Sequence, residues 1–251
     1  MTKITAIIPT LNEEIHIEEA IKSVCFADEI IVIDSFSTDK TIELAKKHDV
    51  KIIQRVFDDF STQKNYAIDQ AKYDWIYILD ADERVTPKLQ KEILDAVKKP
   101  KDNVGFFIRR AFYFMEKKVN YGGVQRDKVI RLFLKKHCKY NGNLVHEKIK
   151  ANGKVGFLKN KIDHYSYRSF DHYISKLNHY AALRSKQLNE QGKKVNLFHL
   201  LIKPPARFVI HYIIRLGFLD GFEGFVIAKT QAYGVFTRYI KLKLLNNGSK
   251  E

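Results

Sequence analysis

Trp75-Ile76-Tyr77-Ile78-Leu79 is a short apolar run that leads directly into the acidic cluster Asp80-Ala81-Asp82-Glu83. The run has the length and composition of a buried strand, so the cluster stands at that strand's carboxyl end. Open α/β sheets bind their ligands along this edge. Two aspartates separated by one small residue can offer oxygens to a ribose and to a divalent cation that also holds a diphosphate. The alternative is an acidic turn that caps the next helix.

Strand and helix signals alternate through the first hundred residues. Short apolar runs predict strands, and apolar residues at helical spacing predict helices between them. The predicted strands are Ile4–Pro9, Glu29–Ile33, Val50–Ile53 and Trp75–Leu79; the predicted helices are Glu13–Val24, a segment around Ile42–Ala45 that Ser37-Thr38-Asp39 can cap, and Thr62–Ala71. This order predicts an α/β fold with a parallel, Rossmann-like sheet covered on both faces.

Residues 1–104 contain no glycine. Dinucleotide-binding folds and P-loops both need glycines where the backbone approaches the phosphates, so neither can exist in this sheet. If the sheet binds a nucleotide, a metal ion or a basic side chain must neutralise the phosphates instead. Asp80 and Asp82 provide ligands for that metal.

Charge is distributed unevenly along the 251 residues. Residues 1–100 hold 14 Lys/Arg against 19 Asp/Glu, whereas the remaining 151 hold 30 against 10, a net charge of +20. A dense cationic face favours an anionic partner, such as nucleic acid, an acidic membrane surface or a phosphorylated glycan. The apolar content of 45% is enough for one large domain, or for one domain plus a smaller lobe.

Cysteine usage and the amino-terminal residues indicate the compartment. Cys25 and Cys138 lack C-x-x-C or Cys/His spacing, and Met1-Thr2-Lys3-Ile4 leads into a strand rather than a long apolar segment. We therefore expect a reduced, cytoplasmic protein.

Several motifs in order along the chain resemble a known family. They are Pro9-Thr10-Leu11-Asn12-Glu13-Glu14, Asp34-Ser35-Phe36-Ser37-Thr38-Asp39, Gln63-Lys64-Asn65, Asp80-Ala81-Asp82-Glu83-Arg84, Gly122-Gly123, Arg131-Leu132-Phe133, Val145-His146-Glu147, His164-Tyr165-Ser166-Tyr167-Arg168 and Gly217-Phe218-Leu219-Asp220-Gly221. The chain resembles the family 2 glycosyltransferases with the GT-A fold, and most closely the branch of lipopolysaccharide-core β-1,4-glucosyltransferases. The resemblance covers nearly the whole chain.

The resemblance implies a nucleotide site at the strand ends. Pro9, Thr10 and Asn12 would line the nucleotide pocket, Asp34 would hydrogen-bond the uracil or the ribose, and Lys64 would lie near the base or the phosphates. Without the resemblance, Asp34 could simply cap the next helix, and a lysine on a helix is more often solvated.

The resemblance also implies a metal. Asp80 and Asp82 correspond to the family's D-x-D motif, in which the first residue contacts the ribose and the last binds Mg²⁺ or Mn²⁺ bridging the diphosphate. The metal acts as a Lewis acid for the leaving nucleoside diphosphate. His164 matches a histidine that many GT-A enzymes place near this metal, although a histidine among aromatic residues is otherwise a packed core residue.

A general base must take the proton of the attacking acceptor hydroxyl. Glu147 is the candidate, because it lies where the family's catalytic acidic residue occurs, although the usual pattern ends Glu-Asp and this chain reads His146-Glu147. Asp127 is the reserve candidate. Direct attack by the acceptor would invert the anomeric carbon.

Long helical patterns replace the strand signals after residue 168, so we predict a catalytic domain over 1–168 and a helical region over 169–251. Leu197–Leu245 is rich in apolar and aromatic residues, contains Pro204-Pro205, and has no uninterrupted apolar run of the ~20 residues that a membrane span requires. Interspersed Lys and Arg favour helices lying on an anionic bilayer surface. The alternative is a lobe that covers the sheet or forms a dimer contact.

The sequence therefore predicts an inverting, metal-dependent enzyme that moves one sugar from a nucleotide sugar, with UDP favoured by the resemblance, to a lipid-linked glycan such as lipopolysaccharide core. We expect it at the inner face of the plasma membrane, without nucleic acid. A processive synthase would carry Q-x-x-R-W, whereas Trp75 is the only tryptophan. The rivals are a sugar-phosphate nucleotidyltransferase, which would need a glycine-rich loop after the first strand, and a non-catalytic basic protein that binds nucleic acid or membranes.

Overall fold

The computed structural model describes residues 2–123, 128–141, 149–167 and 169–248. The chain divides into two compact units. One, the α/β unit, comprises residues 1–111 and 127–164; the other, the helical unit, comprises residues 112–126 and 165–251. Residues 112–126 thus group with the helical unit, although they lie inside the range predicted as the catalytic domain.

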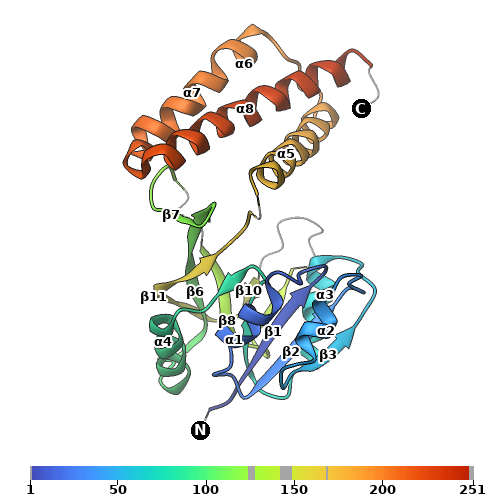
Figure 1. Cartoon of the computed structure of the whole chain (residues 1–251), viewed down its shortest axis with the longest axis vertical. Coiled ribbons are helices and arrows are strands. Elements are labelled where there is room, and N and C mark those ends of the chain that lie inside the picture. The colour runs from blue at the N-terminus through green and yellow to red at the C-terminus, as the bar shows by residue number, and fades with distance from the viewer. Residues whose placement is uncertain (1, 124–127, 142–148, 168, 249–251) are drawn as a thin grey trace. The chain divides into compact units, whose positions relative to one another are not determined.

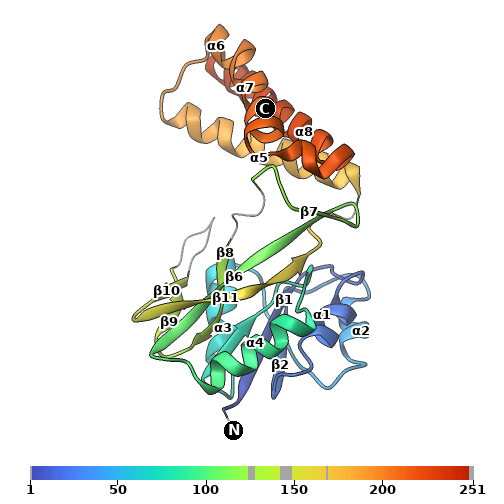
Figure 2. The ribbon, with the colours of Figure 1, turned by 90° about the vertical axis from the view of Figure 1, so that its left-hand side faces the viewer.

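Nine strands of the described residues form one mixed sheet, ordered β3-β2-β1-β4-β8-β6-β11-β5, with β7 paired to β6 (Figure 1). Its strands are β1 (Ile4–Thr10), β2 (Glu29–Asp34), β3 (Lys51–Gln54), β4 (Trp75–Ile78), β5 (Glu83–Arg84), β6 (Asn103–Phe114), β7 (Lys117–Val119), β8 (Lys128–Leu134) and β11 (Lys154–His164). β3, β2, β1 and β4 are parallel, as the sequence predicts. β8 then joins β4 antiparallel, and β6 joins β8 antiparallel. A separate hairpin pairs β9 (Cys138–Tyr140) with β10 (Ile149–Ala151) (Figure 2).

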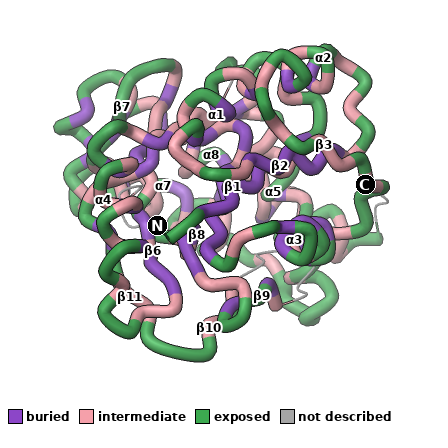
Figure 3. The backbone as a smooth tube through the Cα atoms, turned by 90° about the horizontal axis from the view of Figure 1, so that it is seen from below, coloured by how far each residue is buried: buried purple, intermediate pink, exposed green. Residues whose placement is uncertain are grey.

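Both faces of the α/β unit's sheet are covered by apolar side chains. One face packs against α1 (Ile17–Ser23), α2 (Thr41–Ala45) and α4 (Pro87–Lys98). The other packs against α3 (Phe60–Asp69) and the β9–β10 hairpin. Alternate residues of β4 pack on opposite faces, because successive strand side chains point to opposite sides of a sheet. The inner strands are therefore buried almost throughout, as the purple stretches near β1 and β8 show in Figure 3.

Local signals explain where the helices of this unit begin. Asp59 caps α3 by accepting from the N–H of Thr62, which moves the start a few residues ahead of the predicted Thr62. Thr86 caps α4 by accepting from the N–H of Leu89, and Pro87 occupies the first turn, where no N–H is needed. α1 is shorter than predicted, because residues 14–16 form a turn before it.

The helical unit is built around two long helices, α5 (Phe170–Glu190) and α8 (Gly221–Asn246), which pack together. Ser169 caps α5. Between them lie α6 (Leu197–Leu201), α7 (Lys203–Val209), a π-helical segment (Ile210–Ile214) and a 3₁₀ turn (Gly217–Asp220). Pro204 and Pro205 fall in the first turn of α7 and start that helix rather than interrupt it.

One window of the helical unit, Leu197–Ile214, has the length and composition of a possible membrane span. It comprises 18 residues with a mean hydropathy of 1.2, and only 11% of it is buried. Lys203 and Arg207 interrupt its apolar run. The window therefore contains no uninterrupted apolar run of the ~20 residues that a span requires.

Candidate functional site

The carboxyl ends of the parallel strands meet at one edge of the sheet. Thr10 of β1 is the register partner of Asp34 of β2, and Asp34 is the partner of Gln54 of β3. β4 ends beside β1, and its chain continues through Leu79 into Asp80. The residues predicted from separate motifs therefore gather along this edge, where a parallel sheet exposes its loops.

The loop after β1 has an asparagine at a position with a left-handed backbone. Asn12 has a left-handed backbone with φ 55°, a conformation that asparagine tolerates better than most residues. Its N–H donates to Ser37 Oγ at 2.8 Å, and its Oδ1 accepts from the N–H of Thr38 at 2.8 Å. Asn12 therefore ties the loop after β1 to the loop after β2, and it shapes the edge of the site.

Asp34 lies in the same network but is fully buried. Its carboxylate accepts from the Ser37 N–H at 3.0 Å, from the Ser37 hydroxyl, and from Gln54 Nε2 at 3.1 Å. These three bonds use most of the acceptor positions of a carboxylate. Asp34 does not cap α2, which begins at Thr41; Asp39 accepts from that residue's N–H instead.

Three cations surround the carboxylate of Asp80. Arg131 of β8 hydrogen-bonds Oδ2, Arg110 of β6 lies 3.5 Å from the same oxygen, and Lys64 of α3 lies 3.5 Å from Oδ1. Burial alone would raise the pKa of Asp80, but the charges of Arg131, Lys64 and Arg110 hold it well below its usual value. Asp80 is therefore an ionised, rigidly held acceptor.

Glu83 binds two arginines of the same cluster. It is fully buried, and its Oε1 accepts from Arg110 Nε at 2.7 Å and from Arg131 at 2.6 Å. Its Oε2 accepts from the N–H of Asp80 at 3.1 Å, so the same side chain orders the acidic turn. Although burial opposes it, the carboxylates of Asp80 and Glu83 raise the pKa of Arg131 well above its usual value. The charges in this cluster compensate one another.

Asp82 faces a different partner, His164. β5 pairs antiparallel with the end of β11, and His164 is the register partner of Glu83. This pairing brings His164 Nε2 to 3.3 Å from Asp82 Oδ2, with side-chain exposures of 19% and 23%. Two residues eighty positions apart thus present a nitrogen and an oxygen side by side at a partly open edge.

The Asp82–His164 pair fits the ligand spacing of a small divalent cation. Metal–oxygen distances of 2.0–2.1 Å in an octahedral site put neighbouring ligand atoms about 3 Å apart. The described residues contain no cluster of three or more His, Cys, Asp or Glu side chains that could hold a metal ion. A cation held here would take its other ligands from substrate phosphates and water, as Mg²⁺ commonly does.

The remaining predicted residues lie in and around this edge. Lys64 is only 5% exposed, so the expectation of a solvated lysine, made without the resemblance, is wrong; its ammonium also lies 5.3 Å from the ring centroid of Tyr140. Pro9 is half-buried, and the buried hydroxyl of Thr10 has no hydrogen-bond partner among the described residues. Glu147 and Asp127, the two candidates for the base, lie outside the described residues.

Sequence reasoning missed the roles of Arg110, Arg131 and Glu83. Arg131 carried a usable signal, because it stands in the otherwise apolar stretch Val129–Leu134 and a charge in a buried strand must be paired. Arg110 had no such signal, because charged and aromatic residues surround it in the sequence.

Comparison with known proteins places this site in a family. The model of "Glycosyl transferase family 2" matches residues 5–176. An uncharacterized glycosyltransferase of Rickettsia typhi is 32% identical over 100% of this chain and 90% of its own length. The lipopolysaccharide core biosynthesis glycosyltransferase LpsC of Rhizobium meliloti is 27% identical over 95% of this chain and 91% of its own.

Solved structures give weaker matches. TarS (residues 1–349) of S. aureus has a TM-score of 0.47 at 14% identity, covering 99% of this chain and 92% of that one. Glucosyl-3-phosphoglycerate synthase of Mycobacterium tuberculosis, solved with Mn²⁺, UDP and glucosyl-3-phosphoglycerate, has a TM-score of 0.39 at 22% identity, covering 45% of each chain. The assignment therefore rests on the sequence family and on the architecture of the α/β unit.

The matched range contains Asp34, Asp80, Asp82 and His164, and so spans the whole strand-end site. It decides against the nucleotidyltransferase and the non-catalytic binding protein. The chain belongs to glycosyl transferase family 2, and it is a glycosyltransferase with the GT-A fold.

Proposed function

We propose that this enzyme transfers a single hexose from UDP-hexose to a lipid-linked glycan with inversion at the anomeric carbon, using Mg²⁺ or Mn²⁺. The observation that carries the proposal is the Asp82–His164 pair, 3.3 Å apart beside the ionised Asp80. LpsC, a relative over nearly the whole chain, is named for lipopolysaccharide core biosynthesis, which supports a glycan of that class as the acceptor.

Asp82 and His164 would hold the cation, which when bound supplies Lewis-acid stabilisation of the leaving diphosphate. Asp80 stays ionised and can accept from ribose hydroxyls. Arg110 and Lys64 lie 3.5 Å from its oxygens, so two cations stand beside the position proposed for the diphosphate. Arg131, held by two carboxylates, orients Asp80 rather than the substrate.

Calorimetric titration of UDP tests the donor site. We expect binding that requires Mn²⁺ and that falls at least tenfold in Asp82→Asn, because a cation ligand is lost. Asp74→Asn is the matched control, since Asp74 precedes the same strand at the opposite edge of the sheet and its side chain is 55% exposed. Metal-independent UDP binding, or equal loss in both variants, would overturn the metal assignment; no UDP binding would overturn the donor assignment.

Glu147 is proposed as the base on its position in the sequence. Glu147→Gln should lower the rate of UDP release from UDP-glucose by ~10²–10⁴-fold while leaving UDP affinity unchanged, because a general base acts only in the chemical step. If Asp127→Asn shows that effect and Glu147→Gln does not, the base is Asp127.

We also propose that the helical unit holds the enzyme on an anionic membrane surface inside the cell. The support is a run of exposed apolar side chains from α6 to the start of α8: Leu197, Leu201, Ile214 and Phe222 are 72%, 63%, 69% and 74% exposed. Residues 197–245 carry seven Lys/Arg and two Asp/Glu. Both acidic residues are engaged, Asp220 by the N–H groups of Asn120 and Tyr121, and Glu223 by Lys117.

A surface position suits this segment better than a span. Lys203 and Arg207 stand in the middle of the Leu197–Ile214 window, and each charge at a bilayer centre costs ~2.5–3.5 kcal/mol on insertion scales. Helices lying in the interface instead keep such side chains among anionic headgroups.

Vesicle co-sedimentation tests the membrane proposal. We expect binding to phosphatidylglycerol vesicles over phosphatidylcholine vesicles, and at least a tenfold loss in the double variant Ile214→Asn, Phe222→Asn. Val56→Asn, which alters a residue 72% exposed in the α/β unit, is the control. If the double variant instead abolishes a dimer in light scattering and leaves vesicle binding intact, the apolar face is a subunit contact.

A further inference from the structure

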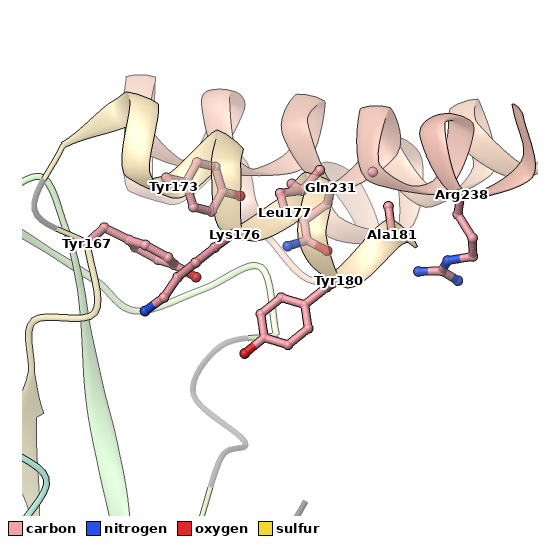
Figure 4. Close-up of a pocket in the computed structure, with 9 residues that line it drawn as sticks. Tyr167, Tyr173, Lys176, Leu177, Tyr180, Ala181, Gln231 and Arg238 are labelled. Carbon is pink, nitrogen blue, oxygen red and sulfur yellow. The ribbon is translucent and has the colours of Figure 1, made fainter. Parts of the chain in front are cut away.

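A cavity of about 220 Å³ lies in the helical unit between α5 and α8, apart from the strand-end site. Its lining includes Tyr167, Lys176, Tyr180, Gln231, Gly234 and Arg238. Figure 4 shows Tyr167 and Lys176 at one end and Arg238 at the other, with the ring of Tyr180 between them. The volume is below the ~300–1,000 Å³ of sites for drug-sized ligands, so it suits one sugar ring rather than an oligosaccharide.

The two cations of this pocket have no carboxylate partner among the described residues. Arg238 makes no hydrogen bond or ion pair with any described residue, and its Nε is buried without a partner. Lys176 donates to the carbonyl of Ser166 at 3.2 Å and lies 5.6 Å from the ring centroid of Tyr167. Burial lowers the pKa of Arg238, and so does the nearby charge of Arg184, although Tyr239 opposes them. A half-buried guanidinium of this kind is stabilised by an anion.

The same cationic character continues along α7 and beyond. Burial and the charges of Arg215 and Arg238 lower the pKa of Arg207, and the buried Nε of Arg207 also has no described hydrogen-bond partner. Arg207 is thus repelled by two other guanidinium groups, and Asp220 and Glu223 of the same unit are engaged elsewhere. These guanidinium groups favour a ligand with phosphate or carboxylate groups.

The uncharged part of the lining suits a sugar ring with its hydroxyl groups. Tyr180 is 59% exposed and offers a broad apolar face with a polar tip. Tyr173, deeper in the pocket, is held by a hydrogen bond of 2.8 Å to Thr230. Gly234 allows the helices to approach, because a Cβ there would lie 2.8 Å from a methyl carbon of Leu177. The pocket is therefore a fixed feature of the α5–α8 packing.

We infer that this pocket binds a sugar bearing a phosphate or carboxylate group, with Arg238 on the anion and the tyrosines on the ring. On the proposed function, this sugar is part of the glycan acceptor, and it is a different sugar from the one that carries the reacting hydroxyl. The pocket would thus select charged acceptor glycans over neutral ones.

Calorimetric titration with glucose 6-phosphate, glucose, inorganic phosphate and dihexanoyl phosphatidylglycerol tests the inference. We expect glucose 6-phosphate to bind at least tenfold more tightly than the other three. Arg238→Gln should weaken it ~10–100-fold, because a charge-assisted hydrogen bond is lost, and Tyr180→Ala should weaken it less. Lys243→Gln removes one charge from an exposed position of the same helix and should change nothing.

Equal affinity for inorganic phosphate would overturn the inference, because it describes a bare anion site. Equal or tighter binding of the phospholipid would overturn it in favour of a lipid headgroup site, and so would an equal effect of Arg238→Gln and Lys243→Gln. Titration of UDP with Mn²⁺ on the same preparations distinguishes this inference from the proposed function. A protein that binds glucose 6-phosphate but not UDP would count against the donor assignment. A protein that binds UDP but not glucose 6-phosphate would count against the acceptor pocket.

Discussion

The two units differ in whether their cationic side chains are paired with carboxylates. In the α/β unit, Arg131, Arg110 and Lys64 meet the carboxylates of Asp80 and Glu83 within 3.5 Å. In the helical unit, the charges of Arg215 and Arg238 act on Arg207, and described carboxylates pair with neither Arg207 nor Arg238.

The charges of the strand-end site are balanced within the protein itself. Those of the helical unit would be balanced only by a ligand. Compensated charges hold their own geometry, which would preorganise the strand-end site for the proposed donor. Uncompensated charges cost stability until an anion joins them. Substitutions at equivalent positions of the two clusters should therefore act with opposite sign.

The largest effect is expected from Arg131→Gln. It leaves the fully buried Glu83 with one cation fewer and removes the hydrogen bond to Asp80, and breaking such a buried network costs ~3–5 kcal/mol of unfolding free energy. Urea unfolding followed by the fluorescence of Trp75, the only tryptophan, reports on the α/β unit alone. Lys128→Gln, at an exposed position of the same strand, is the control; a loss no larger than the control's would contradict the network.

An intermediate effect is expected from pH. Burial, with the charges of Arg207 and Arg215, lowers the pKa of His211 to about 4 from 6.5. The unfolded chain binds a proton near pH 6.5 and the folded protein only near pH 4, so the free energy of unfolding falls by up to ~3 kcal/mol as the pH drops between these values.

Unfolding midpoints between pH 4 and pH 7, followed by circular dichroism, measure this dependence. His211→Gln should flatten it, whereas His179→Gln, at an exposed position of α5, should not. Equal slopes in all three proteins would show that His211 titrates normally.

The smallest expected effect is a change in unfolding free energy of the opposite sign. Arg238→Gln should leave the helical unit's unfolding free energy unchanged or raise it by at most ~1 kcal/mol, because it removes a repulsive charge without breaking a described bond. Glucose 6-phosphate should stabilise the wild type and not the variant. A destabilisation comparable to that of Arg131→Gln would mean that Arg238 has a structural partner.

The sequence was most informative where local patterns and strand order decide the structure. The four parallel strands follow from their apolar runs. The lack of glycine before Gly105 argued against a glycine-rich phosphate cradle. Asp80 and Asp82 could be placed at a strand end because Trp75–Leu79 reads as a strand. Asn12 filled the left-handed loop position that a glycine would otherwise take.

Long-range pairing could not be predicted in the same way. The contact between Asp82 and His164 depends on β5 joining β11 across eighty residues, and only the family resemblance suggested it. The burial of Lys64 depends on α3 lying beside the β9–β10 hairpin, which no local pattern predicts. The α5–α8 pocket escaped notice because its tyrosines read as ordinary positions on a helical face.

Pulsed electron paramagnetic resonance of the Mn²⁺·UDP complex tests the central claim most directly. The account predicts a modulation from an imidazole nitrogen bound to Mn²⁺ in the wild type, lost in His164→Gln and kept in His48→Gln, which alters a histidine that lies beside Glu18. A wild-type complex that binds Mn²⁺ and UDP without any nitrogen modulation would contradict the assignment of the metal to Asp82 and His164.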